Sequence, residues 1–339
     1  MNLLPSSRFA LAWLLPLGVM AAAALSPWAA WLATLTYQVA LALAERVPAW
    51  QNSPPAQPQT AWHRVCIRAH VPLQAALLGW ALWLTQSPGI SAWAVVALGI
   101  GVGGVTGSQG ITFAHELGHS RSRLDRALAW GLMASVNYAH FMVEHYRGHH
   151  PRAATHDDPA TARWGESLWH FLPRSVLGGW ASAWRLEAQQ LRHLRRGWQR
   201  SPLLWATAAQ GAGMVALALW LGPLALLLWV VQSAYAVFLL EAINYIEHYG
   251  LQRRSVAGRR EPFGVMHAWN ADAALTNAFI ANLQRHSDHH MHAWKPYAEL
   301  QPLPGPQLPT GYAGCLFLAS VPRLWFGAMH PRLKQLQAG

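Results

Sequence analysis

Long runs of uncharged residues dominate the chain. Three stretches contain no Asp, Glu, Lys or Arg: residues 9–44, 69–114 and 201–240. Each is about twice the roughly 20 residues that cross a bilayer, and each has a turn signal near its middle. The turn signals are Ser26-Pro27, Ser87-Pro88-Gly89 and Gly222-Pro223. The pattern predicts an all-α integral membrane protein with three helical hairpins, whose six spanning helices cover about residues 9–26, 28–45, 69–86, 91–114, 202–221 and 224–243.

The positions of the charged residues predict how this topology is oriented in the membrane. If the three turns face outward, all 25 Lys and Arg residues lie on the opposite side of the membrane, which the positive-inside rule makes cytoplasmic. The net charge of +11 is concentrated in residues 185–200 and 253–260. These segments can contact anionic lipid headgroups or an acidic soluble protein, and nucleic acid is not an expected partner.

Nine of the 18 histidines lie in four short segments. They are His115 and His119; His145, His149 and His150; His248; and His286, His289 and His290. Spacings of three and four residues place side chains on one face of a helix, and adjacent histidines can serve two neighbouring ions. All four segments lie at the cytoplasmic helix ends, in residues 115–200 and 244–339. Imidazole is the commonest protein metal ligand, so the sequence predicts a compact polynuclear metal site in this layer.

Two segments leave the topology open. Residues 1–25 have the pattern of a signal peptide, with Arg8, an apolar run and an alanine-rich end, and their removal would leave five spanning helices. Residues 127–143 form a further uncharged run, but a crossing there would put His115 and His145 on opposite faces of the membrane. We therefore expect an interfacial or re-entrant helix that carries Asn137, Tyr138 and His140 toward the metal site.

Taken alone, His115-Glu116-Leu117-Gly118-His119 matches the zinc-protease pattern of two histidines one turn apart with a glutamate as general base. A catalytic zinc ion needs only three protein ligands, so this interpretation leaves seven histidines unexplained. An isolated histidine such as His248 is usually structural, but this one follows a spanning helix into the histidine layer. We therefore count it among the candidate ligands.

The four segments together resemble the membrane alkane monooxygenases and the related xylene monooxygenase hydroxylases. The resemblance covers nearly all of the chain from about Thr112 to Pro331, including Asp157-Asp158-Pro159-Ala160-Thr161 and the run from Leu283 to His290. Two features depart from the family: Ser120 stands where a lysine is usual, and the region before Val71 shares little beyond hydropathy.

The resemblance implies a fatty-acid-desaturase-like fold in the bacterial inner membrane, with a single domain of residues 1–339 and a cytoplasmic cap. It implies two iron ions held by the nine histidines, dioxygen as co-substrate, and terminal hydroxylation of n-alkanes that enter from the bilayer. The chain has no nucleotide-binding glycine loop and no cysteine cluster. Electrons would therefore come from rubredoxin or a ferredoxin-type reductase, docked on the arginine-rich face. The alternatives are hydroxylation of alkylbenzene methyl groups, a fatty-acyl desaturase or hydroxylase, and, in another class, a membrane zinc protease or metal transporter.

Nine neutral imidazoles would leave the charge of two ferrous ions almost uncompensated, so we expect carboxylates to contact the ligands. The candidates adjoin a proposed ligand or lie in the same layer: Glu116, Glu144, Asp157, Asp158, Glu187, Glu247, Asp272 and Asp288, with Glu241 also nearby. Some of them will pair with arginines instead. We expect four other histidines, His140, His156, His267 and His292, to be supporting or structural.

Three glycines recur every four residues before His115, at Gly99, Gly103 and Gly107. This spacing favours close approach of a neighbouring helix. The alternative is that the missing side chains leave room for a substrate channel.

Overall fold

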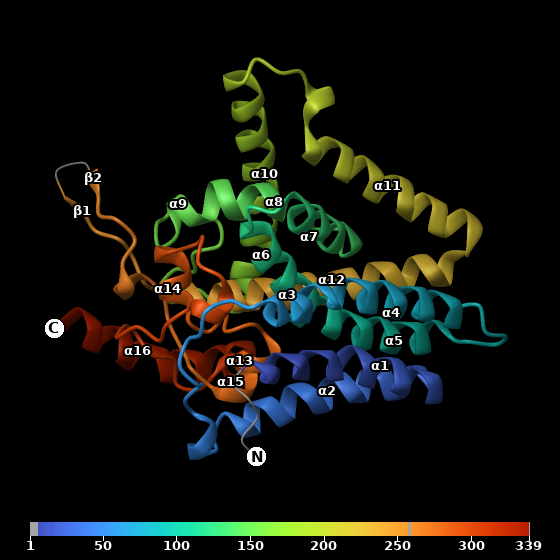
Figure 1. Cartoon of the computed structure of the whole chain (residues 1–339), viewed down its shortest axis with the longest axis horizontal. Coiled ribbons are helices and arrows are strands. Elements are labelled where there is room, and N and C mark those ends of the chain that lie inside the picture. Colours follow the sequence, from blue (N-terminus) through green and yellow to red (C-terminus); the bar gives the residue numbers. More distant parts are fainter. Residues whose placement is uncertain (1–5, 257–258, 339) are drawn as a thin grey trace.

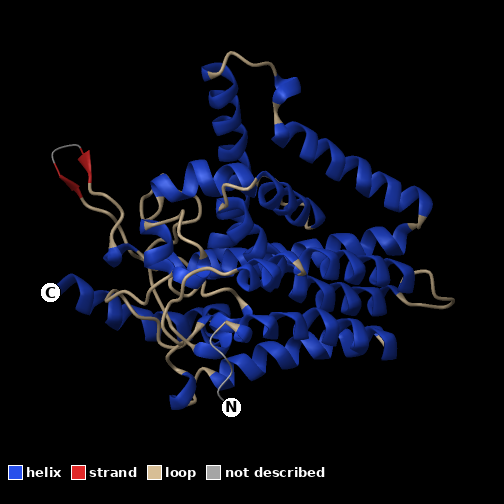
Figure 2. Ribbon diagram, in the orientation of Figure 1, coloured by secondary structure: helices blue, strands red, loops and turns tan. Residues whose placement is uncertain are grey.

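The computed structural model describes residues 6–256 and 259–338, so residues 1–5, 257–258 and 339 of the predicted domain lie outside the described part. Its regular secondary structure is almost entirely helical, with loops between the helices, as Figure 2 shows. The sheet in the described part is a short antiparallel pair, β1 (Ser255–Val256) with β2 (Arg259–Arg260). The prediction of a helical protein is confirmed.

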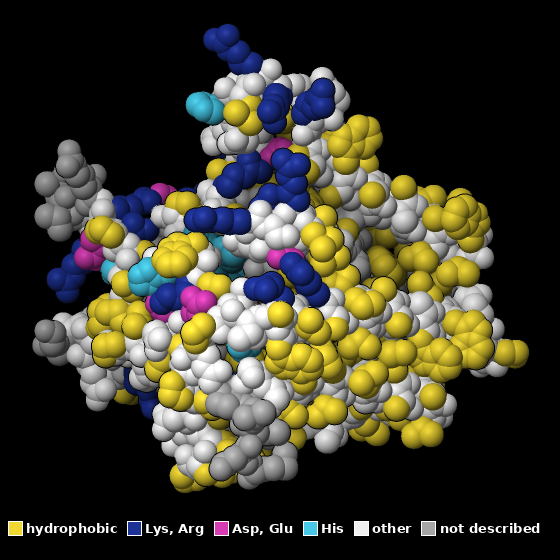
Figure 3. All heavy atoms as spheres, viewed as in Figure 1, with side chains coloured by type: hydrophobic (Ala, Val, Ile, Leu, Met, Phe, Trp, Pro, Cys, Tyr) yellow, Lys and Arg dark blue, Asp and Glu magenta, His cyan; other side chains and the backbone are white. Residues whose placement is uncertain are grey.

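Five helical stretches among the described residues are long and apolar enough to cross a membrane: Ser7–Leu25, Ala61–Leu84, Ala92–His119, Pro202–Trp220 and Pro223–His248. They comprise η1 (Ser7–Trp13) with α1 (Leu14–Leu25), α3 (Ala61–Arg68) with α4 (His70–Leu84), a stretch from α5 (Ala92–Val105) to α6 (Thr112–His119), α11 (Pro202–Trp220) and α12 (Pro223–His248). Figure 3 shows hydrophobic side chains over the end of the molecule that these helices build. The chain is thus an apolar helical protein of the membrane type.

The remaining predicted span is α2 (Pro27–Ala44), whose 18 residues follow directly on α1. Its polar residues Thr34, Tyr37 and Gln38 lower its hydropathy, so α2 is not among the five apolar stretches. The turn before it is nevertheless where the sequence places it, because Ser26 caps α2 by accepting a hydrogen bond from the backbone N–H of Ala29 at 3.0 Å. A crossing by α2 stays a prediction.

Glycines in α5 and in the helical turn after it bring this stretch close to α12. A Cβ atom at Gly99 would lie 2.8 Å from Cγ1 of Val231, and one at Gly103 would lie 2.7 Å from the carbonyl oxygen of Gln232. A Cβ at Gly107 would lie 2.7 Å from Cα of Ala236, also on α12. Larger side chains would force α5 and α12 apart, so the close-packing interpretation of these glycines is confirmed.

The predicted helix over residues 127–143 is instead two short helices, α7 (Arg123–Ser135) and α8 (Phe141–Glu144). The break contains Asn137, which adopts the left-handed conformation at φ 54°. At 13 residues α7 is too short to span a bilayer, which agrees with the prediction that this segment does not cross. The sequence missed the break because the run is uncharged throughout.

The remaining elements form a cap at one end of the apolar helices. They are η2 (Pro48–Trp50), α9 (His150–Arg152), α10 (Leu168–His193), η5 (Trp198–Arg200), η6 (Val265–His267), α13 (Ala274–Phe279), α14 (His286–Met291), η7 (Tyr297–Glu299), α15 (Tyr312–Ser320) and α16 (Pro322–Ala338). Figure 1 shows α9, α14 and α16 at the end opposite the α4–α5 turn, whereas the connection from α10 to α11 projects away from them. The histidine segments of the sequence therefore converge at one end of the molecule.

Candidate metal centre

The nine histidines form two compact groups. Within each group, one ring nitrogen of every histidine lies within 4.8 Å of those of the others. The first group is His115, His119, His145, His150 and His289, and the second is His149, His248, His286 and His290. One correction concerns His248, which does not follow the last spanning helix but is the final residue of α12 itself. The helix thus delivers this imidazole directly into the second group.

Two π-helical turns set the directions of these side chains. They are η3 (Thr106–Ile111), just before α6, and η4 (His145–His149), which leads into α9. In a regular α-helix His149 would share a face with His145, and His150 would point elsewhere. The wider turn instead aligns residues five apart, so His145 and His150 meet with their Nε2 atoms 3.0 Å apart while His149 joins the other group. Periodicity alone gives no signal for this turn.

Imidazoles from distant segments meet within each group. In the first group, the Nε2 atoms of His115 and His289 are 2.9 Å apart, and those of His119 and His145 are 3.4 Å apart. In the second group, the Nε2 atoms of His248 and His286 are 3.2 Å apart. Rings also meet across the groups, because those of His150 and His290 stack at 4.5 Å. Two metal ions held by these groups would therefore be neighbours.

The ring nitrogens are suited to metal binding. Nε2 of His149 and both ring nitrogens of His290 are buried and have no hydrogen-bond partner. Burial, followed by the charge of neighbouring imidazoles, places the pKa of His145, His289 and His290 well below the usual value. These rings are neutral at physiological pH and expose lone pairs, which is the state that binds metal. Buried nitrogens without partners are costly, and a bound cation would satisfy them.

Comparisons with known proteins agree with this geometry. The family model for fatty acid desaturases matches residues 91–326. Alkane 1-monooxygenase 2 of Pseudomonas aeruginosa is 41% identical over 287 residues, which are 82% of this chain and 75% of the relative. The chain belongs to the alkane monooxygenase branch of the fatty acid desaturase family.

Two further relatives come from Pseudomonas putida. Its alkane 1-monooxygenase is 36% identical over 83% of this chain and 72% of the relative. Its xylene/toluene monooxygenase hydroxylase component is 28% identical over 68% of this chain and 62% of the relative. Both relatives are named as monooxygenases, and this chain is likewise an oxidoreductase of the monooxygenase type.

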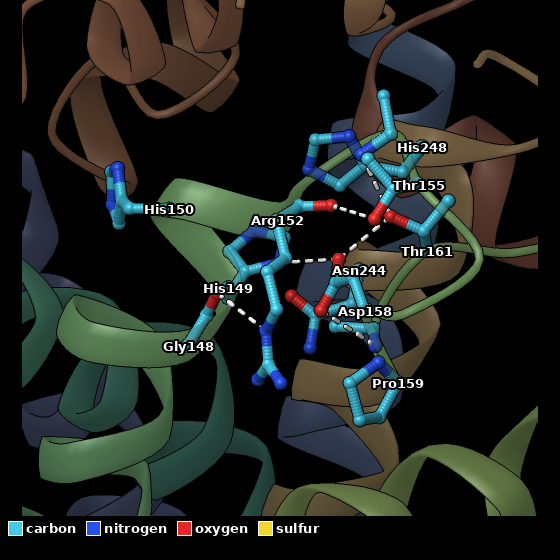
Figure 4. Close-up of polar contacts among 12 residues, drawn as sticks. Gly148, His149, His150, Arg152, Thr155, Asp158, Pro159, Thr161, Asn244 and His248 are labelled. Carbon is cyan, nitrogen blue, oxygen red and sulfur yellow. Dashed lines mark hydrogen bonds and ion pairs between the residues drawn. The ribbon is translucent and has the colours of Figure 1, made fainter. Parts of the chain in front are cut away.

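Two of the eight candidate carboxylates in this family member contact a histidine of the centre. Asp158 is fully buried, and its Oδ2 lies 2.9 Å from Nδ1 of His149 and accepts a hydrogen bond from Thr161 at 2.6 Å. Figure 4 shows Asp158 and Thr161 beside His149, with His150 lying apart. Oε1 of Glu247 lies 3.2 Å from Nδ1 of His286. The Asp158 contact would fix the ring of His149 with Nε2 directed at the metal. Nδ1 of His286, in contrast, has no hydrogen-bond partner, and Glu247 accepts a hydrogen bond from Tyr312 at 2.7 Å.

The other six candidates have partners outside the two groups. Asp272 lies near the second histidine group, because it pairs at 2.8 Å with the buried Arg285 that precedes His286. The partners of the rest are the backbone N–H of Tyr297 for Glu116, Arg152 for Glu144, Arg260 for Asp157, Arg147 for Glu187 and Lys295 for Asp288. Sequence proximity to a ligand therefore does not by itself place a carboxylate on it.

The supporting histidines have varied surroundings. His140 and Tyr138 line a small cavity of about 30 Å³ beside His145 and His149, as expected for that segment, whereas Asn137 donates to Ser233 instead. The Tyr138 hydroxyl donates to Glu241 at 2.6 Å. His267 contacts the centre through its backbone, since its carbonyl oxygen lies 3.4 Å from Nδ1 of His248. His156 forms a hydrogen bond with Gln252, and His292 forms one with Asp288. Neither histidine belongs to the two groups.

An apolar cavity of about 100 Å³ reaches the histidines from the helical bundle. Its walls come from α2, the η3–α6 stretch, α12 and α15, and its inner end is formed by His115, His145 and His286. Leu41, Ile111, Leu239, Leu240, Ile243 and Leu316 provide most of the apolar lining. Gly107 lines it too, so one of the three glycines serves packing and cavity together.

Glu45 is a structural residue of the site that the sequence did not single out. Its buried carboxylate accepts hydrogen bonds from Thr276, from Thr310 and from the backbone N–H groups of Ala313 and Gly314. Burial raises the pKa of Glu45 despite these donors. Through them the end of α2 is tied to α13 and α15, which also line the cavity. A signal was present, because Glu45 is the first charged residue after the first uncharged run.

Proposed function

We propose that this protein is a non-haem di-iron monooxygenase that converts n-alkanes to 1-alkanols. The observation that carries the proposal is the arrangement of five and four histidines in adjacent groups at the inner end of an apolar cavity. A hydrocarbon has no polar group to be recognised, so an apolar wall that ends at metal ligands is the site it requires.

Each histidine group would hold one iron ion, with His115, His119, His145, His150 and His289 on one and His149, His248, His286 and His290 on the other. When bound, the two ions supply activation of dioxygen, in which two electrons and two protons release one oxygen atom as water and the other enters a C–H bond. Asp158 holds the ring of His149 in orientation and offsets positive charge, and Glu247 lies beside Nδ1 of His286.

The cavity would position the substrate. Its aliphatic side chains exclude water and hold an alkyl chain in extended form, with the end carbon toward His115 and His145. We expect terminal hydroxylation, because a chain end can reach His115 and His145 while the rest of the alkane stays against the apolar lining.

The membrane arrangement proposed with this function has six spans, the sixth being α2, in the bacterial inner membrane. Support comes from the packing of α2 against α5, where a Cβ at Gly101 would lie 2.7 Å from the carbonyl oxygen of Ala30. The cap and all Lys and Arg residues would then be cytoplasmic. Electrons would come from rubredoxin or a ferredoxin-type reductase on that side.

A second candidate substrate is the methyl group of an alkylbenzene. The relative named xylene/toluene monooxygenase hydroxylase component favours it, although at 28% identity it is less similar than the alkane 1-monooxygenases. A zinc protease is disfavoured, since three protein ligands would suffice for its ion.

The decisive experiment is to express the chain with a rubredoxin and its reductase, supply n-alkanes and alkylbenzenes, and identify products by gas chromatography. We expect 1-alkanols, and iron in the purified protein. A matched pair of variants controls for folding: His286→Ala should abolish product, whereas His193→Ala, an exposed residue at the end of α10, should not. Alkenes in place of alcohols, or zinc without iron, would contradict the proposal.

A further inference from the structure

A broad groove of about 830 Å³ lies on the cap and is lined by residues from 250–254, 261–267 and α16. Trp164 and Met266 line it and are 40% and 45% exposed, and Leu333 and Leu336 of α16 also belong to the lining. Figure 1 shows β1, β2 and α16 at the end of the molecule opposite the α4–α5 turn, so the groove lies at that end. An exposed apolar patch facing water marks an interaction surface.

The rim of the groove is cationic. Arg254 lines it, and Lys334 follows Leu333 on α16; both are exposed, and neither has an ion pair with a carboxylate of the described residues. Of the acidic residues nearby, Asp157 pairs with Arg260, and Glu261 hydrogen-bonds His267 and accepts a hydrogen bond from the backbone N–H of Arg254. Exposed apolar side chains beside a rim where cations outnumber carboxylates fit a protein with an acidic face.

The lining of the groove adjoins the second histidine group. Phe263 stands between two residues of the lining, Pro262 and Gly264, and its ring stacks on that of His290 at 4.6 Å. His267 lines the groove, and its carbonyl oxygen lies 3.4 Å from Nδ1 of His248. Two short routes therefore join the groove surface to ligands of one proposed iron. Electron transfer slows steeply with distance, so this part of the lining is the favourable crossing point.

The other cationic segment, residues 185–200, reaches the histidine segments through the ion pair of Glu187 with Arg147 of η4. Figure 1 shows the end of α10 and its connection to α11 projecting away from α9 and α14, and Figure 3 shows Lys and Arg side chains gathered on that projection. The cationic residues that a carrier would bind there, such as Arg196, come after Glu187, at and beyond the end of α10.

We propose that the groove docks a small acidic one-electron carrier protein and that electrons cross the wall formed by Phe263 and His267. This rests on the proposed function, because it needs iron at the second histidine group. Each encounter oxidises the carrier by one electron and reduces one ferric ion by one electron. Two encounters supply one turnover, and no protein bond forms or breaks.

The test measures binding of a purified rubredoxin to the iron-loaded protein in nanodiscs. Reversing the rim in the double variant Arg254→Glu, Lys334→Glu should weaken binding by about tenfold or more at low salt, because two attractive contacts become repulsive. Arg196→Glu, an exposed residue beyond α10, should change it by less than about twofold. If the double variant and Arg196→Glu weaken rubredoxin binding equally, or if neither weakens it, the groove is not the docking site.

Cross-linking locates the carrier independently. The two native cysteines, Cys66 and Cys315, are buried, so a photo-cross-linker attached to Met266→Cys reports on the groove and one on Trp198→Cys on the α10 projection. We expect rubredoxin to cross-link only at the first. Cross-linking only at Trp198→Cys would refute the proposal, and so would binding of the groove to vesicles of anionic lipid in preference to rubredoxin.

Chemical reduction separates the two proposals. Protein reduced with dithionite and then given O₂ and an alkane should form alcohol in the rim variant as in the native protein, because no docking is needed. If the rim variant forms alcohol after dithionite reduction and still binds rubredoxin as the native protein does, the docking groove is rejected and the hydroxylase function is not. No alcohol from the dithionite-reduced native protein would reject the hydroxylase function itself.

Discussion

At the scale of single residues, the centre depends on neighbours in sequence that face different ways. His149 and His150 belong to different groups, as do His289 and His290. One short helix can thus supply ligands to two ions, which keeps the ions close without a long connecting loop. The same division applies to carboxylates, since Asp158 contacts His149 whereas the adjacent Asp157 pairs with Arg260 at the surface.

We predict that His150→Ala lowers iron content and abolishes hydroxylation. His150 is one of five ligands of the first group, and its Nε2 lies 3.0 Å from that of His145, so its loss opens the site. Iron is measured by plasma mass spectrometry on purified protein. His156→Ala, which removes a histidine outside both groups, should keep native iron content. Unchanged iron in His150→Ala would argue against its role as a ligand.

The pair of aspartates offers a matched test of ligand orientation. Burial alone would raise the pKa of Asp158, but His149 and Thr161 outweigh it and the pKa is lowered, so the carboxylate is ionised beside His149. We predict that Asp158→Asn lowers iron affinity or activity by about 10- to 100-fold. Asp157→Asn removes only an exposed ion pair and should have little effect. Iron titration of both variants is the measurement, and equal losses would show a general charge effect instead.

At the scale of elements, glycines and π-helical turns position the site. Glycines on opposite sides of α5 let it contact both α12 and α2, and the bundle so formed holds His115 and His248 at the ends of two adjacent helices. The turns η3 and η4 then rotate the ligands relative to their helices. The hydropathy pattern predicted the helices and their approximate ends, but it contained no sign of these turns, because a π-turn depends on tertiary contacts more than on local preference.

We predict opposite effects of alanine at two helical glycines. Gly103→Ala places a Cβ 2.7 Å from the Gln232 carbonyl oxygen and should destabilise the protein by about 1–3 kcal/mol. Gly79→Ala, in α4, has no atom within 4 Å of its new Cβ and should stabilise it by up to about 1 kcal/mol through helix propensity. Thermal unfolding in detergent compares them. Equal melting temperatures would mean that the α5–α12 contact can relax.

At the scale of the whole molecule, an apolar bundle and a polar cap meet at one cavity. Elements far apart in sequence, α2, α6, α12 and α15, form its walls, and Glu45 holds α2 to the cap. The surface is divided in the same way, because hydrophobic side chains cover the bundle and charged side chains cover the cap (Figure 3). In the proposed function, substrate would enter from the membrane and electrons would reach the cap from a soluble carrier.

We predict that filling the cavity changes which alkanes react. Leu240→Trp adds volume to the α12 wall about two turns from His248, so turnover of longer alkanes should fall more than that of shorter ones. Iron content should stay native, because Leu240 touches no proposed ligand directly. Leu219→Trp, at a side chain that is 76% exposed on α11, is the matched control. A uniform loss across chain lengths, seen by product analysis, would indicate misfolding rather than a shorter site.

The sequence by itself determined the helical class, the positions of the turns and the nine clustered histidines, because hydropathy and spacing act over a few neighbouring residues. Only the tertiary structure decided how those histidines divide into five and four, which carboxylates support them, and where the cavity and the groove lie. Asp157 and Asp158 are equivalent candidates in the sequence and differ only in what the fold places beside them. Such pairings join residues tens to hundreds of positions apart, and no local pattern encodes which distant side chain will be the partner.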